Sequence, residues 1–182
     1  MTEISNSIYI DTQLQLRALN PDDSPALFAL IDTNREYLAR FLPWVEDTLS
    51  INDSLGFINK SFENYANNIE YNFGIFYQDR LVGMISIRTA NHLGAPLEIG
   101  YWIAEAYSGK GITTQATDAI TKYGFDQLGL SQISIFAQID NPASNKIAKK
   151  IDYQLIDSKT KIDGKIINHW IKYPPPDQIN PK

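Results

Sequence analysis

The chain has 182 residues, a net charge of −5, 43% hydrophobic and 20% charged residues, and no cysteine. This size and apolar content exclude a disordered chain and fit a single domain with a packed core, predicted over residues 1–173. Disulfides, thiolate metal ligands and a cysteine acyl-enzyme are excluded, the negative charge argues against nucleic-acid binding, and the lack of a signal pattern or a long apolar stretch predicts a cytoplasmic protein without membrane contact.

One strand and three helices are predicted in the first third of the chain. Residues 14–18 alternate apolar and polar positions, as a half-buried strand does, and Asn20 and Pro21 are typical of a helix start. Pro43 is expected to end the second helix. The predicted helices run from Asn20 to about residue 31, over residues 35–42 and over residues 50–67.

Strands and helices then alternate. Residues 71–77 and 81–89 read as a hairpin, and residues 97–103 as the next strand of an antiparallel meander, after a loop over residues 90–95. The remaining predicted elements are a helix over residues 112–128 that stops at Gly129, a strand over 133–139, a helix over 143–151, and a hairpin of residues 153–158 and 166–173 around Asp163 and Gly164. Three consecutive prolines should end regular structure, so residues 174–182 are expected to form a mobile tail.

The segment Ser108-Gly109-Lys110-Gly111 lies between a predicted strand and the helix that begins near Ile112. The first amides of a helix have no intrahelical partners and carry a partial positive charge, and glycine lets the backbone approach an anion closely. We therefore expect a phosphate site, with Lys110, Thr113 and Thr114 as further donors. The alternative is a tight turn with incidental glycines. Neither a Walker-type phosphate loop nor a dinucleotide fingerprint matches this spacing.

The order of these elements, together with the glycine segment, resembles the GNAT superfamily of N-acetyltransferases. The segment from Ser108 to Thr113 is similar to the pyrophosphate-binding motif of that family, with Gly111 as the matched glycine. Ser108 replaces the usual leading Gln or Arg, and Thr113 replaces a small residue. The resemblance implies an α+β fold with a mixed, mainly antiparallel central sheet of about seven strands flanked by helices.

Four further segments resemble the branch that acetylates the N-terminal alanine or serine of ribosomal proteins. They are Asn34-Arg35-Glu36-Tyr37-Leu38, Phe41-Leu42-Pro43-Trp44, Glu98-Ile99-Gly100-Tyr101-Trp102-Ile103 and Asn141-Pro142-Ala143-Ser144. One departure is Asp152, which stands where the family has glycine. We expect a left-handed backbone there, which Asp tolerates better than most residues.

The resemblance implies a role for each candidate site residue. Ile103 and Ala104 would lie nearest the coenzyme, and the loop and helix start at Ser108, Gly109, Lys110, Gly111, Ile112, Thr113 and Thr114 would bind its pyrophosphate. Glu98 would accept the amine proton, unless it is an ordinary strand carboxylate in an ion pair. Ser144 would protonate the leaving thiolate and Asn141 would bind the pantetheine arm, unless both only cap a helix.

The acceptor side is less defined. Tyr37, Phe41, Leu42 and Trp44 are candidates for the wall of an acceptor pocket, although aromatic residues at helical spacing are more often core. His92 and His169 are interpreted as loop and strand residues, and no metal site is expected.

We therefore hypothesise an N-acetyltransferase that uses acetyl-CoA and acts on an amine, such as the N-terminal amine of a ribosomal protein. The alternatives are a small-amine acetyltransferase and a catalytically silent acyl-CoA-binding or regulatory domain. The sequence leaves the acceptor and the oligomeric state open, a homo-oligomer included.

Overall fold

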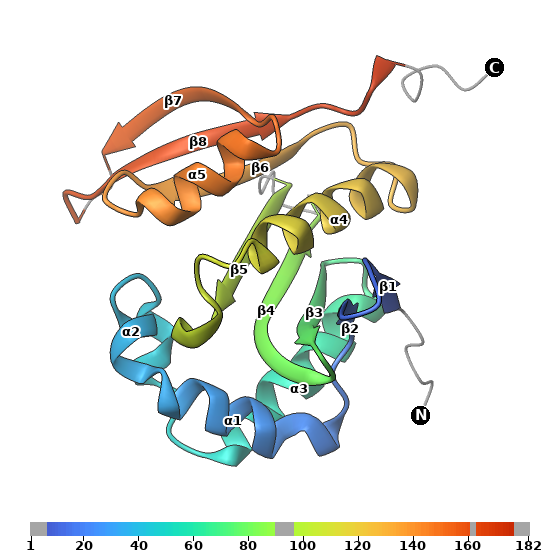
Figure 1. Cartoon of the computed structure of the whole chain (residues 1–182), viewed down its shortest axis with the longest axis vertical. Helices are drawn as coiled ribbons and strands as arrows, with labels where there is room; N and C mark the ends of the chain where they lie inside the picture. Colours follow the sequence, from blue (N-terminus) through green and yellow to red (C-terminus); the bar gives the residue numbers. More distant parts are fainter. Residues whose placement is uncertain (1–6, 90–96, 161–162, 177–182) are drawn as a thin grey trace.

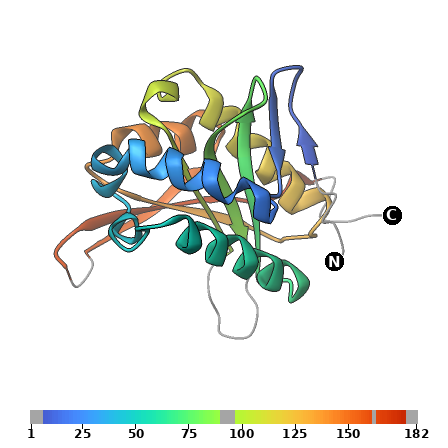
Figure 2. The same cartoon turned by 90° about the horizontal axis from the view of Figure 1, so that it is seen from below.

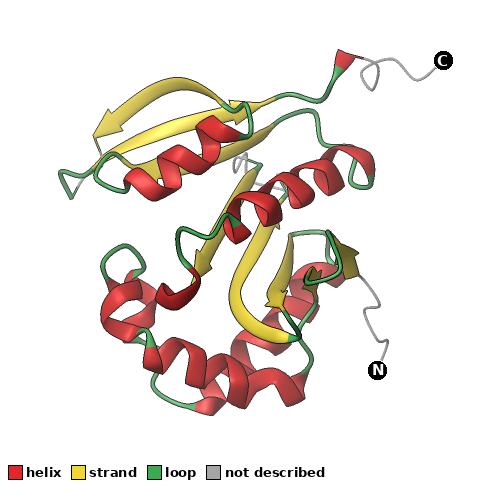
Figure 3. Ribbon diagram, viewed as in Figure 1, coloured by secondary structure: helices red, strands yellow, loops and turns green. Residues whose placement is uncertain are grey.

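The computed structural model describes residues 7–89, 97–160 and 163–176, and its strands form one continuous sheet (Figures 1 and 3). The eight described strands lie in the order β1-β2-β3-β4-β5-β6-β8-β7. Neighbours are antiparallel except β5 and β6, which run parallel. The strands are β1 (Ser7–Tyr9), β2 (Leu14–Arg17), β3 (Glu70–Tyr77), β4 (Arg80–Arg88), β5 (Glu98–Ile103), β6 (Ile133–Gln138), β7 (Gln154–Thr160) and β8 (Ile166–Lys172).

Helices cover both faces of this sheet. The α-helices are α1 (Ser24–Thr33), α2 (Arg35–Ala39), α3 (Ile51–Ala66), α4 (Ile112–Asp126) and α5 (Pro142–Lys150), and the 3-10 helices are η1 (Pro21–Asp23), η2 (Pro43–Glu46) and η3 (Glu105–Tyr107). Helices α1 and α3 lie side by side on one face, against β4 and β3 (Figure 2). Helix α4 contacts β4 and β5 from the other face, and α5 contacts α4, β6 and β7.

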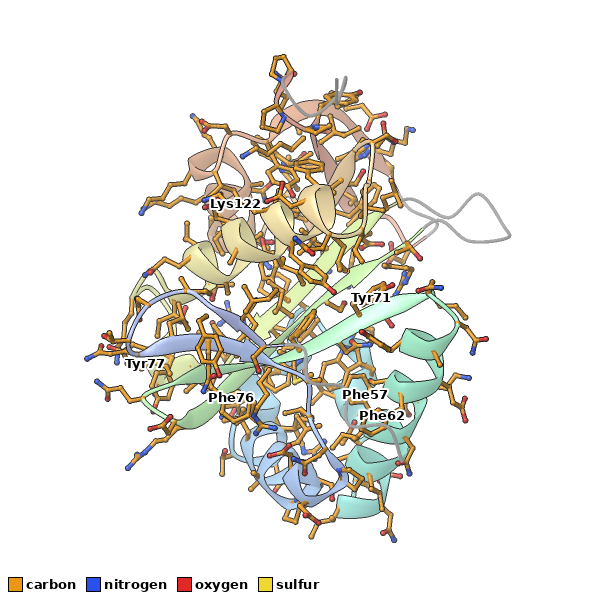
Figure 4. All side chains as sticks on the ribbon, turned by 90° about the vertical axis from the view of Figure 1, so that its right-hand side faces the viewer. Phe57, Phe62, Tyr71, Phe76, Tyr77 and Lys122 are labelled. Carbon is orange, nitrogen blue, oxygen red and sulfur yellow. The ribbon has the colours of Figure 1, made fainter. Side chains whose placement is uncertain are left out.

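Alternation along β4 divides its side chains between two cores. Ile85 and Ile87 are buried in the core with α4 and α5, whereas Met84 is buried in the core with α1 and α3. Figure 4 shows Phe57 and Phe62 on the side of α3 that faces the sheet. Each fully buried aliphatic side chain stabilises the fold by about 1.5–3 kcal/mol, so both helix layers are held by burial against the same strands.

The parallel strands β5 and β6 meet only near their amino ends. Their registered pair is Glu98 with Ser134, and the Ser134 amide donates to Leu97 O at 2.6 Å. Beyond that point the two strands no longer pair with each other, although β5 stays paired with β4 and β6 with β8. They part toward their carboxyl ends (Figure 1). The sheet therefore has a V-shaped opening between β5 and β6, roofed on one face by α4 and α5.

The predicted fold class is confirmed, and the departures are local. The sheet has eight described strands rather than about seven, because the three-residue β1 pairs with β2 through Ile8 and Leu16 and is too short to show a pattern. The second helix ends at Ala39, not at residue 42 as predicted. Pro43 does not end that helix but begins η2, since proline is well suited to the first helical position.

Asp152 has the expected left-handed backbone, with φ 63°. It follows α5, where the amide of Asp152 donates to Lys149 O at 3.3 Å and that of Tyr153 donates to Ala148 O at 3.0 Å. These two bonds form a Schellman motif with Asp at the position that usually holds glycine. The turn seats Tyr153 in the core, where it is 3% exposed.

Candidate active site

The glycine loop opens at the amino end of α4. Gly109 and Gly111 have φ values of 74° and 82°, and a Cβ atom at either position would meet no described residue within 4 Å. Gly111 is the N-cap of α4 and offers no side chain, and the Gln115 amide is bonded to Gly111 O at 3.1 Å. The amides of Ile112 and Thr113 precede that first helical bond and have no intrahelical partner. This loop is an open cradle of backbone donors at the positive end of a helix dipole, suited to an anion.

Backbone groups of β5 line the V-shaped opening. The Ala104 amide donates to Val82 O of β4 at 2.8 Å, whereas Leu97 O accepts from β6. Because successive residues of a strand turn their backbone groups to opposite sides, those of Tyr101 and Ile103 face the opening. Ile103 therefore presents its amide toward the opening, while the amide of Ala104 is already bound within the sheet.

Ser144 reaches β5 from the first turn of α5. Its Oγ lies 2.8 Å from Oη of Tyr101, and its amide donates to Asn141 Oδ1 at 3.1 Å. Burial raises the pKa of Tyr101 to about 12, although the hydrogen bond with Ser144 acts in the opposite direction. The phenol therefore stays protonated at neutral pH and can donate. Asn141 caps α5 with its carbonyl oxygen, which leaves its amide nitrogen for a ligand.

Glu98 lies on the opposite face of β5. Ile99 and Tyr101 point into the core with α4 and α5, so alternation turns Glu98 to the face of α1 and α3. Arg88 bridges two carboxylates there, at 3.6 Å from Glu98 Oε2 and 3.3 Å from Glu70 Oε1. Glu98 is thus in an ion pair, as the structural alternative expected. Its side chain is still 29% exposed and can meet an incoming group from that face.

A pocket of about 320 Å³ lies on the same face as Glu98. Its lining residues come from α1, η2 and the turn after it, α3, β4 and β5: Leu27, Ile31, Trp44, Asp47, Thr48, Asp53, Ser54, Phe57, Met84 and Trp102. The rings of Trp44 and Trp102 lie 6.0 Å apart, centroid to centroid. Of the predicted wall residues, Trp44 lines this pocket, whereas Tyr37, Phe41 and Leu42 do not. The Arg40 guanidinium lies over the rings of Tyr37 and Phe41 at 5.9 and 5.7 Å.

Two residues that were given no role in the sequence analysis hold the wall of this pocket. Arg35 donates to Val45 O and, at 2.7 Å, to Thr48 O, which fixes the η2 turn that carries Trp44. Asn34 accepts from the Glu105 amide at 2.9 Å and so ties α1 to the end of β5. Both residues belong to segment 34–38, which resembles the family branch, but that resemblance did not predict these contacts.

The sequence matches a known enzyme family over most of its length. The acetyltransferase (GNAT) domain matches residues 13–154, most of the sequence. The chain belongs to the GNAT acetyltransferase family. The protein named "Putative ribosomal N-acetyltransferase YdaF" of Bacillus subtilis (strain 168) is 31% identical over 160 residues, 87% of this chain and 86% of its own. The ribosomal-protein-serine acetyltransferase of Escherichia coli (strain K12) is 29% identical over 145 residues, 80% of this chain and 81% of its own.

Solved structures share the fold of this acetyltransferase. RimL, a ribosomal L7/L12 alpha-N-protein acetyltransferase in complex with coenzyme A, matches with a TM-score of 0.85 and 23% identity over 92% of this chain and 98% of its own. The microcin C7 self-immunity acetyltransferase MccE, in complex with acetyl-CoA and AMP, matches with a TM-score of 0.82 and 24% identity over 90% of this chain and 94% of its own. At these identities the likeness shows the fold.

His169 is a residue of β8, as predicted, and it has two polar neighbours. Its Nε2 lies 2.9 Å from Ser134 Oγ, its ring stacks on Phe136, and its Nδ1 lies 3.7 Å from Asp157 Oδ1. The order of groups is that of a hydrolytic triad, but the Asp contact is too long for a hydrogen bond and Ser134 is only 1% exposed. This acetyltransferase therefore has no hydrolase site there. His92 lies outside the described residues.

The described residues contain neither a metal-binding cluster nor a membrane-spanning helix. Within them, no three His, Asp or Glu side chains are placed to hold a metal ion. No helix of the described ranges has the length and apolar composition needed to span a membrane.

Proposed function

We propose that this acetyltransferase moves the acetyl group of acetyl-CoA onto the N-terminal α-amine of a protein such as a ribosomal protein. The observation that carries the proposal is the division of the site by β5. The groups for the coenzyme lie on one side of β5: the glycine cradle, the V-shaped opening and Ser144. The groups for the acceptor lie on the other side: Glu98 and the pocket at Trp102. Donor and acceptor can then approach the same point from opposite sides.

The residues of the donor side fit the coenzyme. The amides of Gly109, Gly111 and Thr113 would bind the pyrophosphate, with Lys110 and Thr114 beside them. Open space at the positions of both Cβ atoms leaves room for this close approach. The Ile103 amide faces the opening and would bind the pantetheine arm, with the Asn141 side chain beyond it. Ser108 adds a hydroxyl to the loop where the family has a longer donor.

The proposed reaction is direct attack on the thioester. The neutral amine nitrogen bonds to the carbonyl carbon, backbone amides of β5 donate to the developing oxyanion, and Glu98 takes the amine proton directly or through water. The carbon–sulfur bond then breaks, and Ser144 protonates the departing thiolate. The phenol of Tyr101, 2.8 Å from the Ser144 hydroxyl, holds that hydroxyl in place.

The pKa of the acceptor's ammonium group favours an α-amine over a lysine side chain. An α-amine with a pKa near 8 is about one tenth neutral at pH 7, whereas a lysine amine near 10.4 is neutral in well under about one part in a thousand. A carboxylate such as Glu98 is a modest base and suits the more acidic ammonium. The relatives from Bacillus subtilis and Escherichia coli are likewise named for ribosomal acceptors. An acceptor of that kind is made in the cytoplasm, where we expect this enzyme.

Acetyl transfer to matched peptides tests the proposal. One peptide has a free N-terminus and an internal lysine, and its control has the same sequence with a blocked N-terminus. Mass spectrometry with fragmentation should place one acetyl group on the α-amine of the first peptide and none on the second. Acetylation confined to the lysine of both peptides would contradict the proposed acceptor, and coenzyme binding without transfer to any amine would favour the silent domain.

A further inference from the structure

Glu98 and Trp102 lie on the face of β5 where the acceptor is proposed to bind, and the residue between them on this face is Gly100. All three alternate positions point to the same side of the strand. Gly100 is exposed, and of the described residues only Ser86 would be met by a Cβ atom there, with its Oγ at 3.7 Å. A bare stretch of strand therefore connects the carboxylate to the pocket. Each two-residue step is about 6.6 Å, so an amine above Gly100 would have Glu98 on one side and the Trp102 wall on the other.

The pocket beyond this stretch is apolar inside and acidic at its rim. Leu27 and Ile31 are buried in its floor, and the two tryptophans form one side. Asp47 and Asp53 are exposed at the rim, and no Lys or Arg is among the lining residues. Hydrogen bonds from the Ser50 hydroxyl and from backbone amides lower the pKa of Asp53, so the rim is anionic at neutral pH. Such a rim attracts an ammonium group and repels acidic substituents.

Ser54 places a buried hydroxyl in the pocket wall. It is 1% exposed, it lines the pocket, and its Oγ has no hydrogen-bond partner among the residues that the structure describes. Buried hydroxyls are nearly always hydrogen-bonded, so the Ser54 hydroxyl can pair with a polar atom of a bound acceptor. A second atom of the bound acceptor, at the far end of an apolar group, can supply that partner.

We infer that the acceptor's amine stands over Gly100 and that its substituent enters the pocket at Trp102. The enzyme then selects amines with an apolar substituent of leucine to tyrosine size. Among these it favours a substituent that carries a hydrogen-bonding atom near Ser54. This inference rests on the proposed acetyl transfer and narrows its acceptor. A water molecule needs only about 10–15 Å³ of such space, so a pocket of about 320 Å³ far exceeds what the methyl or hydroxymethyl group of alanine or serine would fill.

Peptides that differ only in their first residue test the selection. The series alanine, serine, leucine, phenylalanine and tyrosine is compared by kcat/KM, with thiol release as the readout and mass spectrometry for the product. Leucine and phenylalanine should exceed alanine by about 10-fold or more, the effect of filling an apolar pocket. Tyrosine should exceed phenylalanine by about 3- to 10-fold, the effect of one neutral hydrogen bond. In Ser54→Ala the tyrosine-to-phenylalanine ratio should fall to one, with the phenylalanine-to-leucine ratio unchanged.

Two glycine substitutions distinguish an effect on the position of the bound amine from a general effect on the fold. Gly100→Ala should raise KM for every acceptor by about 10-fold or more, because the methyl group occupies the floor beneath the amine. The control is Gly56→Ala, at an exposed position of α3 with equally open space, which should leave the kinetics unchanged.

Alanine or serine peptides that react as fast as the larger ones would overturn the inference while the proposed function stands, and so would a tyrosine-to-phenylalanine ratio that Ser54→Ala does not change. If no peptide in the series gains an acetyl group, the proposed function fails and the inference fails with it.

Discussion

Replacing Gly111 by valine should separate coenzyme binding from fold stability. Gly111 has φ 82° and caps α4 with its backbone alone. A β-branched side chain at this left-handed position costs about 1–3 kcal/mol of unfolding free energy. The same side chain would stand in the open space through which the pyrophosphate approaches the loop. Losing two hydrogen bonds to a charged group, at about 1.5–3 kcal/mol each, should raise the coenzyme Kd by about 100-fold or more.

Gly129→Val is the matched control. Gly129 is also left-handed, with φ 63°, and a Cβ atom there would likewise meet no described residue within 4 Å, but it follows the opposite end of α4. Both variants should lose similar stability in urea unfolding, and only Gly111→Val should lose affinity for coenzyme A in calorimetry. An unchanged Kd in Gly111→Val, or an equal loss of affinity in both variants, would refute the assigned cradle.

Three further substitutions have defined outcomes. Asp152→Gly should leave the unfolding free energy unchanged or raise it by up to about 1 kcal/mol, because relief of left-handed strain offsets the added unfolded-state entropy, and a clear drop in Tm would contradict the strain. Burial raises the pKa of Tyr101 to about 12, against about 10 when unfolded, so the stability contributed by its protonated phenol is complete below pH 10 and is lost as pH rises toward 12. Between pH 8 and 11, Tyr101→Phe should lose less stability in urea unfolding than the wild type, although other tyrosines with raised pKa values still contribute a loss in both proteins. Equal losses in both proteins would be inconsistent with the buried phenol. Ser144→Ala should lower turnover at every pH with coenzyme Kd nearly unchanged, and recovery of its rate at high pH would exclude a role at the leaving thiolate.

Elements with strong local signals could be predicted from the sequence. The short polar turn at residues 78–80 predicted the hairpin of β3 and β4, and the helical spacing predicted α3, both close to the observed elements. Ser50 and Asp53 form the capping box that begins α3. The left-handed backbone of Asp152 was expected because the resembling family has glycine there, and α4 begins at Ile112, directly after the glycine loop, as predicted.

The parts that could not be predicted depend on contacts between distant elements. The contact of Tyr101 with Ser144 joins β5 to α5, and it requires knowing which face of β5 each residue occupies. The pocket brings Ser54 of α3 to Trp102 of β5, and neither residue has a local pattern that marks a site. Aromatic residues near Trp44 were predicted as wall residues from their type alone, and Tyr37 and Phe41 instead lie beside Arg40.

The pH dependence of turnover in Glu98→Gln tests most directly whether β5 separates a base on one face from the coenzyme on the other. The variant keeps the size of the side chain but cannot take a proton. With an acceptor of the wild type, its rate at pH 7 should fall by about two to four orders of magnitude, with coenzyme Kd nearly unchanged, and should recover as rising pH deprotonates the amine in solution. A Glu98→Gln protein that turns over at nearly the wild-type rate at pH 7 would show that Glu98 is a structural partner of Arg88 and that the proton leaves by another route.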